Sequence, residues 1–145
     1  MRIAVIADTH DKLPLHVLAA ICEADEIWHL GDITTHAIPD TLRATERPLR
    51  FVRGNCDFDH SWPLSLAFEI EGFRVQLIHI PPPFAGPGVD LLFHGHTHVP
   101  RNELVGGTRF YNPGCITRPN RGAPASYAWL ELERGKPADW TLVKV

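Results

Sequence analysis

The chain has 145 residues, of which 44% are hydrophobic and 21% are charged, which is the composition of an ordinary globular domain. Its formal net charge is −3 and no run of lysine or arginine occurs, which argues against long nucleic acid as a partner. Three widely separated cysteines, Cys22, Cys56 and Cys115, form no CxxC pair, so we expect reduced thiols and a cytoplasmic protein.

The first half of the chain alternates short apolar runs with helical patterns. We predict strands at residues 2–7, 26–30 and 48–53, and helices at residues 13–24 and 38–46. The first apolar run ends at Asp8, which makes it too short for a signal peptide or a membrane-spanning helix, so no membrane partner is expected. Strands that alternate with helices imply right-handed crossovers and a parallel sheet.

The second half of the chain has strand patterns without helices between them. Glu71-Gly72 separates residues 66–70 from 73–80, which predicts a hairpin, and a stiff loop begins at Pro81-Pro82-Pro83. Further strands are predicted at residues 90–94, 108–111, 126–133 and 139–144. We therefore expect a single α/β (α+β) domain over residues 1–145, with two mixed β-sheets packed as a sandwich and flanked by helices. In the simplest arrangement each half of the chain forms one sheet.

Residues that can bind a metal ion follow several of the predicted strands. Polar groups at the carboxyl ends of strands meet at one edge of a sheet and can form a site there. Aspartate, histidine and asparagine suit a borderline divalent metal better than they suit a nucleophile. Asp8 and His10 are two residues apart, so on an extended segment both can reach one ion. The full set is Asp8, His10, Asp32, Asn55, His79, His96 and His98.

This set contains enough ligands for two ions that share one carboxylate, and Asp32 is the natural bridge. A bridging carboxylate holds two metals roughly 3.5–4 Å apart, which is the spacing of two-metal phosphoryl chemistry. Two divalent ions, two carboxylates and a bridging hydroxide leave a local charge of about +1, which matches a phosphodiester monoanion. Four imidazoles disfavour magnesium and calcium, so we expect two divalent ions, with manganese preferred and zinc, iron, nickel or cobalt as alternatives.

The order of the short motifs resembles that of the calcineurin-like metallophosphoesterases, in particular their small single-domain phosphodiesterase branch. The motifs are DTH at 8–10, GD at 31–32, GNCD at 54–57, a lone His79 and GHTH at 95–98. The resemblance covers roughly residues 3–121. It implies that one ion takes Asp8, His10, Asp32 and His98, and that the other takes Asp32, Asn55, His79 and His96.

The resemblance also implies a metal-dependent phosphodiesterase in which a metal-bridging hydroxide attacks phosphorus in line. Asp32, Asn55 and Asp57 are then the expected catalytic residues, and manganese is the metal that fits best among the relatives. Arg118 is expected to bind the substrate because its planar guanidinium can pair with a phosphate oxygen. His94 is expected to lie behind the ligands rather than among them.

Two positions depart from the pattern of the family. Cys56 stands where related phosphatases have a histidine that protonates the leaving group. A thiol is a poorer proton donor to an alkoxide, so we expect Cys56 to contact substrate and to favour esters with good leaving groups. Ile80 and three prolines follow His79, where relatives continue with glycine, so the substrate loop is expected to have another shape.

Two other functions remain open from the sequence. One is a phosphomonoesterase that acts on a small metabolite, because the same metal pair also binds a dianion. The other is a non-catalytic scaffold that resembles a retromer subunit, which shares the fold but has an altered metal site. The complete ligand set in this chain disfavours the scaffold. In either enzyme the partner is a small phosphate ester, and the fold can form a homo-oligomer through a strand edge.

Overall fold

Two five-stranded β-sheets and two helices make up the computed structural model, which describes residues 1–145. The first sheet has the strand order β10-β9-β1-β2-β3. Its strands are β1 (Arg2–Ile6), β2 (Glu26–His29), β3 (Leu49–Phe51), β9 (Ser126–Glu131) and β10 (Asp139–Lys144). The second sheet has the order β4-β5-β6-β8-β7. Its strands are β4 (Ser65–Ile70), β5 (Phe73–Ile78), β6 (Leu91–Phe93), β7 (Arg101–Val105) and β8 (Thr108–Asn112).

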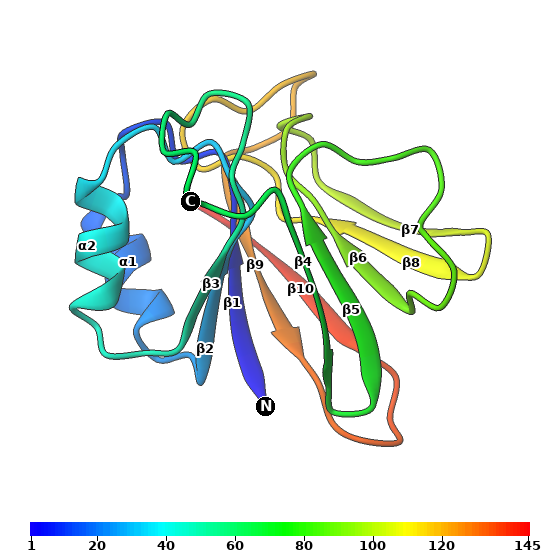
Figure 1. Cartoon of the computed structure of the whole chain (residues 1–145). Helices are drawn as coiled ribbons and strands as arrows, with labels where there is room; N and C mark the ends of the chain where they lie inside the picture. The colour runs from blue at the N-terminus through cyan, green and yellow to red at the C-terminus, as the bar shows by residue number, and fades with distance from the viewer.

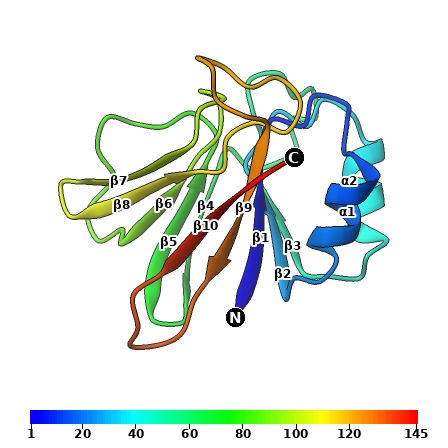
Figure 2. The same cartoon turned by 180° about the vertical axis from the view of Figure 1, so that it is seen from behind.

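The first sheet is the middle layer of three. One face packs against the second sheet, and the helices α1 (Leu15–Ile21) and α2 (Ala37–Arg43) cover the other face (Figures 1 and 2). Alternate residues of β1 therefore enter two different cores. Ile3 and Val5 lie between the sheets, whereas Ala4 and Ile6 pack under the helices. Burial on both faces explains why this strand is an unbroken apolar run.

The two-sheet sandwich predicted from the sequence is confirmed, but the sheets do not correspond to the two halves of the chain. β9 and β10 return to the first sheet, where β9 pairs antiparallel with β1. Four of the six residues of β9 are buried, among them Tyr127, Ala128 and Leu130, which suits a strand in the interior of a sheet. The helices also flank one face of the sandwich only, because the outer face of the second sheet is partly solvated (Figure 1).

The strand β7 was not predicted from the sequence. β7 reads RNELV, with no alternation of apolar and polar residues, and lies at the edge of the second sheet, where its central residues are exposed. An edge strand with little burial carries no hydrophobic pattern, so its pairing with β8 is determined by the backbone. The predicted helices are also shorter in the structure, and neither is long and apolar enough to cross a membrane.

The central strands determine where the site forms. β1, β2 and β3 are parallel, so their carboxyl ends lie at the same end of the sheet, which is the upper end in Figure 1. β5 and β6 are parallel as well, and they bring a second pair of carboxyl ends to the loops that follow. The backbone contacts continue beyond the strands, because Asp8 N–H donates to the Gly31 carbonyl at 3.0 Å. The loops that follow β1 and β2 are thus joined.

Candidate metal centre

All seven predicted ligands lie together in the structure, on loops that follow β1, β2, β3, β5 and β6. Four of them form a compact cluster whose candidate ligand atoms all lie within 4.8 Å of one another. We call this cluster the first ligand group; it contains Asp8, His10, Asp32 and His98. The remaining three side chains lie on the side of the other oxygen of Asp32. Together with Asp32 they form a set that we call the second ligand group; it contains Asp32, Asn55, His79 and His96.

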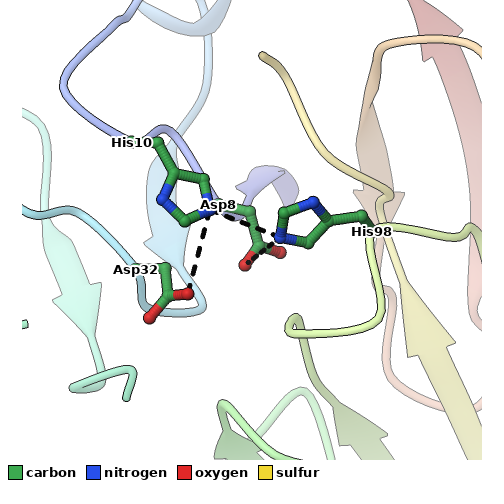
Figure 3. Close-up of side chains that lie close together, drawn as sticks. All are labelled: Asp8, His10, Asp32 and His98. Atoms are coloured by element: carbon green, nitrogen blue, oxygen red, sulfur yellow. Dashed lines mark hydrogen bonds and ion pairs between the residues drawn. The ribbon is translucent and has the colours of Figure 1, made fainter. Parts of the chain in front are cut away.

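In the first ligand group the ligand atoms point at a common centre (Figure 3). The Nε2 atoms of His10 and His98 are 3.3 Å apart. Asp8 Oδ1 is 3.4 Å from His98 Nε2, and Asp32 Oδ2 is 3.8 Å from His10 Nε2. Two imidazole nitrogens and two carboxylate oxygens in this arrangement form a donor set that suits a borderline divalent cation.

In the second ligand group the side chains converge on the amide oxygen of Asn55. Asn55 Oδ1 lies 2.8 Å from His96 Nδ1 and 3.1 Å from His79 Nε2. His79 Nε2 is also 3.3 Å from Asp32 Oδ1, so Asp32 directs one oxygen toward each group. Asp32 Oδ1 additionally accepts the backbone N–H of Cys56 at 2.9 Å. This geometry is the one that a shared carboxylate requires.

The carboxylate of Asp8 is the strongest sign that the first ligand group needs a cation. Asp8 is fully buried, and its Oδ1 atom has no hydrogen-bond partner. Burial raises the pKa of Asp8 to about 7, and the nearby His79 and His98 offset this only in part. A buried, unpartnered carboxylate oxygen is costly, and a metal ion removes that cost by direct coordination.

Asp32 behaves differently from Asp8. Burial by itself raises the pKa of its carboxyl, but hydrogen bonds from His79 and from the backbone N–H of Cys56 outweigh burial and hold the pKa well below its usual range. Asp32 is therefore ionised at neutral pH and carries negative charge between the two ligand groups. An ionised carboxylate with one oxygen toward each group can be shared by two cations.

Two imidazole rings are oriented by backbone carbonyls. His79 Nδ1 donates to the Leu30 carbonyl at 2.7 Å, and His98 Nδ1 donates to the Arg118 carbonyl at 2.5 Å. These bonds leave the Nε2 lone pair of each ring for a metal, as is usual for metal-binding histidines. Around His79 Nε2 lie only acceptor oxygens, from Asp32 and Asn55, which favour a cation at this point. For the same reason the charge and hydrogen bond of Asp32 raise the pKa of His79, although burial alone would lower it.

The backbone conformation of the ligand residues differs from the extended one that was expected. The prediction placed Asp8 and His10 on an extended segment, but Asp8, His10, Asp32, His96 and His98 all have φ between 42° and 68°. Non-glycine residues rarely adopt this left-handed region, and such residues concentrate at functional sites. His96 and His98 consequently direct their rings to different ligand groups, although they are two residues apart. Asp8 and His10 do lie in one ligand group, as predicted, but the extended segment expected to bring them together is not present.

Two glycines allow the loops to approach the carboxylates closely. A Cβ atom at Gly54 would lie 2.1 Å from Asp32 Oδ1, and one at Gly95 would lie 2.9 Å from Asp8 Oδ2. Any side chain at either position would displace a ligand carboxylate. The glycines of the GNCD and GHTH motifs are thus needed for space around the ligands.

Asp57 does not direct its carboxylate at the ligand groups. It accepts four backbone N–H groups, from Ile33 and Thr34 at 2.7 Å, from Asp32 at 3.0 Å and from Gly54 at 2.6 Å. These bonds join the loop after β2 to the loop after β3. Asp57 was predicted to be catalytic, whereas its contacts are those of a positioning residue. Its place three residues after Gly54 in a loop was the available signal, because loop aspartates commonly accept backbone N–H groups.

The remaining predicted residues lie around the ligand groups. Cys56 is an exposed residue beside Asn55. Partial desolvation of its sulfur, together with the hydrogen bond and charge of Asp32, raises the pKa of its thiol. Arg118 is exposed, and its carbonyl orients His98. His94 is buried behind the ligands, where its Nδ1 contacts the Gly95 carbonyl at 3.0 Å. Burial lowers the pKa of His94 to about 4.

Comparison with known proteins supports the same chemistry. A family model described as "Calcineurin-like phosphoesterase superfamily domain" matches residues 1–135. A protein of Methanothermobacter thermautotrophicus named "Probable metallophosphoesterase" is 35% identical, and the match covers 86% of this chain and 83% of that protein. "Phosphodiesterase YfcE" of Escherichia coli K12 is 29% identical, over 90% of this chain and 88% of that protein.

A similar fold is found among solved structures. The structure of Vps29 complexed with zinc from Entamoeba histolytica has a TM-score of 0.79 to this chain at 22% sequence identity, and the match covers 99% of each chain. At this level of identity the likeness concerns the fold alone. The overall fold is therefore shared with a protein of low sequence identity.

Proposed function

Because this chain belongs to the calcineurin-like phosphoesterase superfamily, we propose that it is a metal-dependent phosphodiesterase that hydrolyses a small phosphate ester. The observation that carries the proposal is the shared position of Asp32, whose two oxygens face His10 at 3.8 Å and His79 at 3.3 Å. Two complete ligand groups around one carboxylate are what two-metal phosphoester hydrolysis requires. The similarity to a phosphodiesterase supports the substrate class.

The first ligand group would hold one divalent ion and the second ligand group would hold the other. The fit of such ions is supported by the unpartnered oxygen of Asp8 and by the acceptor oxygens around His79 Nε2. When bound, two such ions polarise phosphate oxygens and lower the pKa of water at neutral pH. Manganese is our first choice of metal, with zinc, iron, nickel or cobalt as alternatives, because four imidazoles disfavour magnesium and calcium.

Asp57 positions the ligand loops, but the site lacks a good proton donor for the leaving group. Asp57 joins the loops that carry Asp32 and Asn55, and thereby sets the distance between the two ligand groups. The raised pKa of the Cys56 thiol keeps it protonated at neutral pH, but a thiol is a poor proton donor to an alkoxide. Esters with good leaving groups are therefore the preferred substrates. Arg118 lies on the loop that orients His98, where its guanidinium can pair with a phosphate oxygen.

The likeness to Vps29 raises a second candidate function, a non-catalytic scaffold. Seven side chains with metal-binding chemistry in two groups favour catalysis over this alternative. A phosphomonoesterase uses the same groups and is separated by substrate alone. The single negative charge of a diester matches the local charge of about +1 left by two divalent ions, two carboxylates and a hydroxide.

A matrix of metals and substrates tests the proposal. The full chain is stripped with a chelator, reloaded with one metal at a time, and assayed with bis(4-nitrophenyl) phosphate and 4-nitrophenyl phosphate. We expect hydrolysis of the diester above that of the monoester, highest with manganese. Faster hydrolysis of the monoester would identify a phosphomonoesterase. A folded, metal-loaded chain that hydrolyses neither ester would favour the scaffold. A cytoplasmic location and homo-oligomerisation stay predictions.

A further inference from the structure

Two cavities adjoin the second ligand group, one on each side of a single hydrogen bond. Asn55 lines one cavity, His96 lines the other, and the two side chains are 2.8 Å apart. Ile80 and Pro81 divide the cavities in the same way, because the first residue lines one and the second lines the other. A phosphodiester held at the ligand groups thus has a separate space for each of its two organic arms.

The cavity on the Asn55 side has an apolar wall. It has a volume of about 350 Å³; Leu64, Ile78 and Ile80 form this wall, and Arg53, Asp57 and His60 also line the cavity. We call it the apolar cavity. Leu64 is 61% exposed and Ile80 is 51% exposed, so both retain surface that an apolar arm can cover. An aromatic leaving group fits this lining.

The cavity on the His96 side is larger and cationic. It has a volume of about 470 Å³, and Arg101 and Arg121 are the only charged residues that line it. We call it the arginine cavity. The guanidinium of Arg101 is fixed 4.6 Å above the ring of Phe110 and bonds Glu103. Arg121 forms no ion pair, so its charge is available to a ligand. A concave surface with unbalanced positive charge attracts anions.

A buried histidine, His94, also lines the arginine cavity, and one of its ring nitrogens has no hydrogen-bond partner. His94 Nδ1 lies 3.0 Å from the Gly95 carbonyl and 3.3 Å from Asn112 Nδ2. Because the two N–H groups of Asn112 have other acceptors, Nδ1 donates to the carbonyl, which makes Nε2 the lone-pair acceptor. Nε2 is buried and has no hydrogen-bond partner. Buried polar atoms are normally paired, so each exception needs an explanation. A hydroxyl group on a ligand in this cavity would supply the missing donor.

The arginine cavity is mechanically joined to the ligand loop. His98 Nδ1 donates to the Arg118 carbonyl at 2.5 Å, and Asn120 N–H donates to the His98 carbonyl at 3.1 Å. Asn120 also accepts the backbone N–H of Arg121 at 2.8 Å. The segment that carries Arg121 is therefore held at a fixed distance from the metal ligands. A substrate that spans both places meets a rigid template.

We propose that the arginine cavity binds a second phosphate group, carried with hydroxyl groups on one arm of the substrate. Arg101 and Arg121 would pair with the phosphate oxygens, and His94 Nε2 would accept a hydroxyl of the same arm. The other arm occupies the apolar cavity. The substrate class is thus a phosphodiester of a phosphorylated polyol or nucleoside. This assignment rests on the proposed phosphodiesterase function, because the reacting phosphate must lie at the ligand groups.

Two substrates that differ only by the remote phosphate test this assignment. They are thymidine 5′-(4-nitrophenyl phosphate) with a 3′-hydroxyl and the same compound with a 3′-phosphate. We expect the wild-type chain to show a kcat/KM that is roughly ten- to a hundredfold higher for the 3′-phosphate, because charge-assisted hydrogen bonds add to binding. In Arg121→Gln and Arg101→Gln this ratio should fall toward one. Arg47→Gln is the matched control, because Arg47 is exposed and lies just before the amino end of β3, whereas the ligand loops follow the carboxyl ends of the parallel strands.

Each result has a defined meaning. A wild-type ratio near one, or a ratio that both arginine variants keep, overturns the assignment. A ratio that falls equally in Arg47→Gln overturns it as well, because the preference would then reflect overall charge. If neither ester is hydrolysed, the proposed function fails, and calorimetry with the manganese-loaded chain decides on the cavity. Tighter binding of thymidine 3′,5′-bisphosphate than of thymidine 5′-phosphate, lost in Arg121→Gln, supports the cavity, whereas equal affinities overturn it.

Discussion

The two ligand groups each contain two histidines and share Asp32, but they differ in the fourth ligand and in how their atoms are partnered. In the first ligand group, Asp8 Oδ1 has no hydrogen-bond partner, and the Nε2 atoms of His10 and His98 face each other at 3.3 Å. In the second ligand group, Asn55 Oδ1 lies within hydrogen-bond distance of both His79 and His96. A cation that enters the first group removes the cost of an unpartnered buried carboxylate oxygen, whereas one that enters the second meets the neutral amide oxygen of Asn55 between the two imidazoles.

This difference implies that the two groups bind metal with unequal affinity. Only the first group contains a buried carboxylate oxygen without a partner, and the neutral amide oxygen in the second attracts a cation less than a carboxylate does. We therefore expect the first ligand group to fill before the second in a metal titration. Two groups of similar composition can thus serve different purposes, one for retention of an ion and one for an exchangeable ion near the substrate cavities.

Removal of Asp32 is expected to have the largest effect, because it belongs to both groups. We expect Asp32→Ala to reduce diester hydrolysis by about a thousandfold or more, since loss of a single stabilising donor at a reacting centre already costs about that much. Metal analysis of the purified variant should show that both ions are lost. Asp139→Ala serves as a control for an exposed aspartate far from the site. A folded Asp32→Ala variant that keeps metal and full hydrolysis would refute the shared-carboxylate scheme.

Asp8→Asn separates the two groups. The amide keeps the shape of the side chain and can accept the N–H of His96, which Asp8 accepts at 3.1 Å. We expect metal affinity at the first ligand group to fall by more than about a hundredfold, because loss of even an indirect partner of a metal ligand costs 10- to 100-fold. Calorimetric titration should then show one binding step in place of two.

The same variant should be more stable than the wild-type chain in EDTA. Replacement of a buried, unpartnered carboxylate by a neutral amide removes a penalty of about 1–3 kcal/mol. Urea unfolding in EDTA measures this change. Lower stability of Asp8→Asn under these conditions would contradict the claim that the first ligand group is built around a cation.

Asp57→Asn tests the connection between the groups. The amide can accept at only one oxygen, so N–H groups of the loops after β2 and β3 lose their partner. We expect the free energy of unfolding to fall by about 1.5–3 kcal/mol, the range for hydrogen bonds to charged groups. Both binding steps should weaken together, unlike in Asp8→Asn. Weakening of one step alone would contradict a role for Asp57 in spacing the two groups.

His29 makes the support of the first ligand group sensitive to acid. His29 is fully buried beneath Thr9, which it contacts at 3.0 Å, and burial lowers its pKa to about 3 from the usual 6.5. The folded-state pKa lies below the unfolded one, so the stability is fully present above pH 6.5 and is lost as the pH falls through 6.5 toward 3. Between pH 8 and pH 5 the loss from this residue is about 2 kcal/mol.

His29→Asn isolates this contribution, because the amide oxygen can replace Nδ1 as acceptor of the Gly31 N–H. Urea unfolding of both proteins at pH 8 and pH 5 in EDTA gives the two slopes. The variant should lose about 2 kcal/mol less than the wild-type chain over this interval. Equal slopes would show that His29 does not remain neutral in the folded protein.

Cys56→His is expected to have the smallest effect and concerns the second ligand group alone. An imidazole beside Asn55 can donate a proton to a departing alkoxide, which the Cys56 thiol does poorly. We expect a gain of roughly tenfold or more for esters with alkyl leaving groups and little change for nitrophenyl esters. Comparison of kcat over a series of leaving groups measures this. An unchanged series would count against weak proton donation at this position.

Much of the fold and of the site was predictable because both leave local patterns. The buried strand β1 is an apolar run on both faces, and it ends where the ligands begin. Asp8, His10, Asp32 and Asn55 follow parallel strands, whose carboxyl ends necessarily meet at one edge. β7 left no such pattern, because an exposed edge strand has no buried face to record.

The sequence by itself determined which residues can bind metal and that they meet, because residue type and strand order are local properties. The family resemblance implied how they are divided between two ions, but only the tertiary structure shows the cause, because the left-handed backbone at His96 and His98 directs two neighbouring rings to different groups. It also decided the role of Asp57. Three of its N–H partners are 23 to 25 residues away in the sequence, and the fourth, Gly54, is three residues away. Such contacts depend on the packing of separate loops, and no periodicity in the chain encodes them.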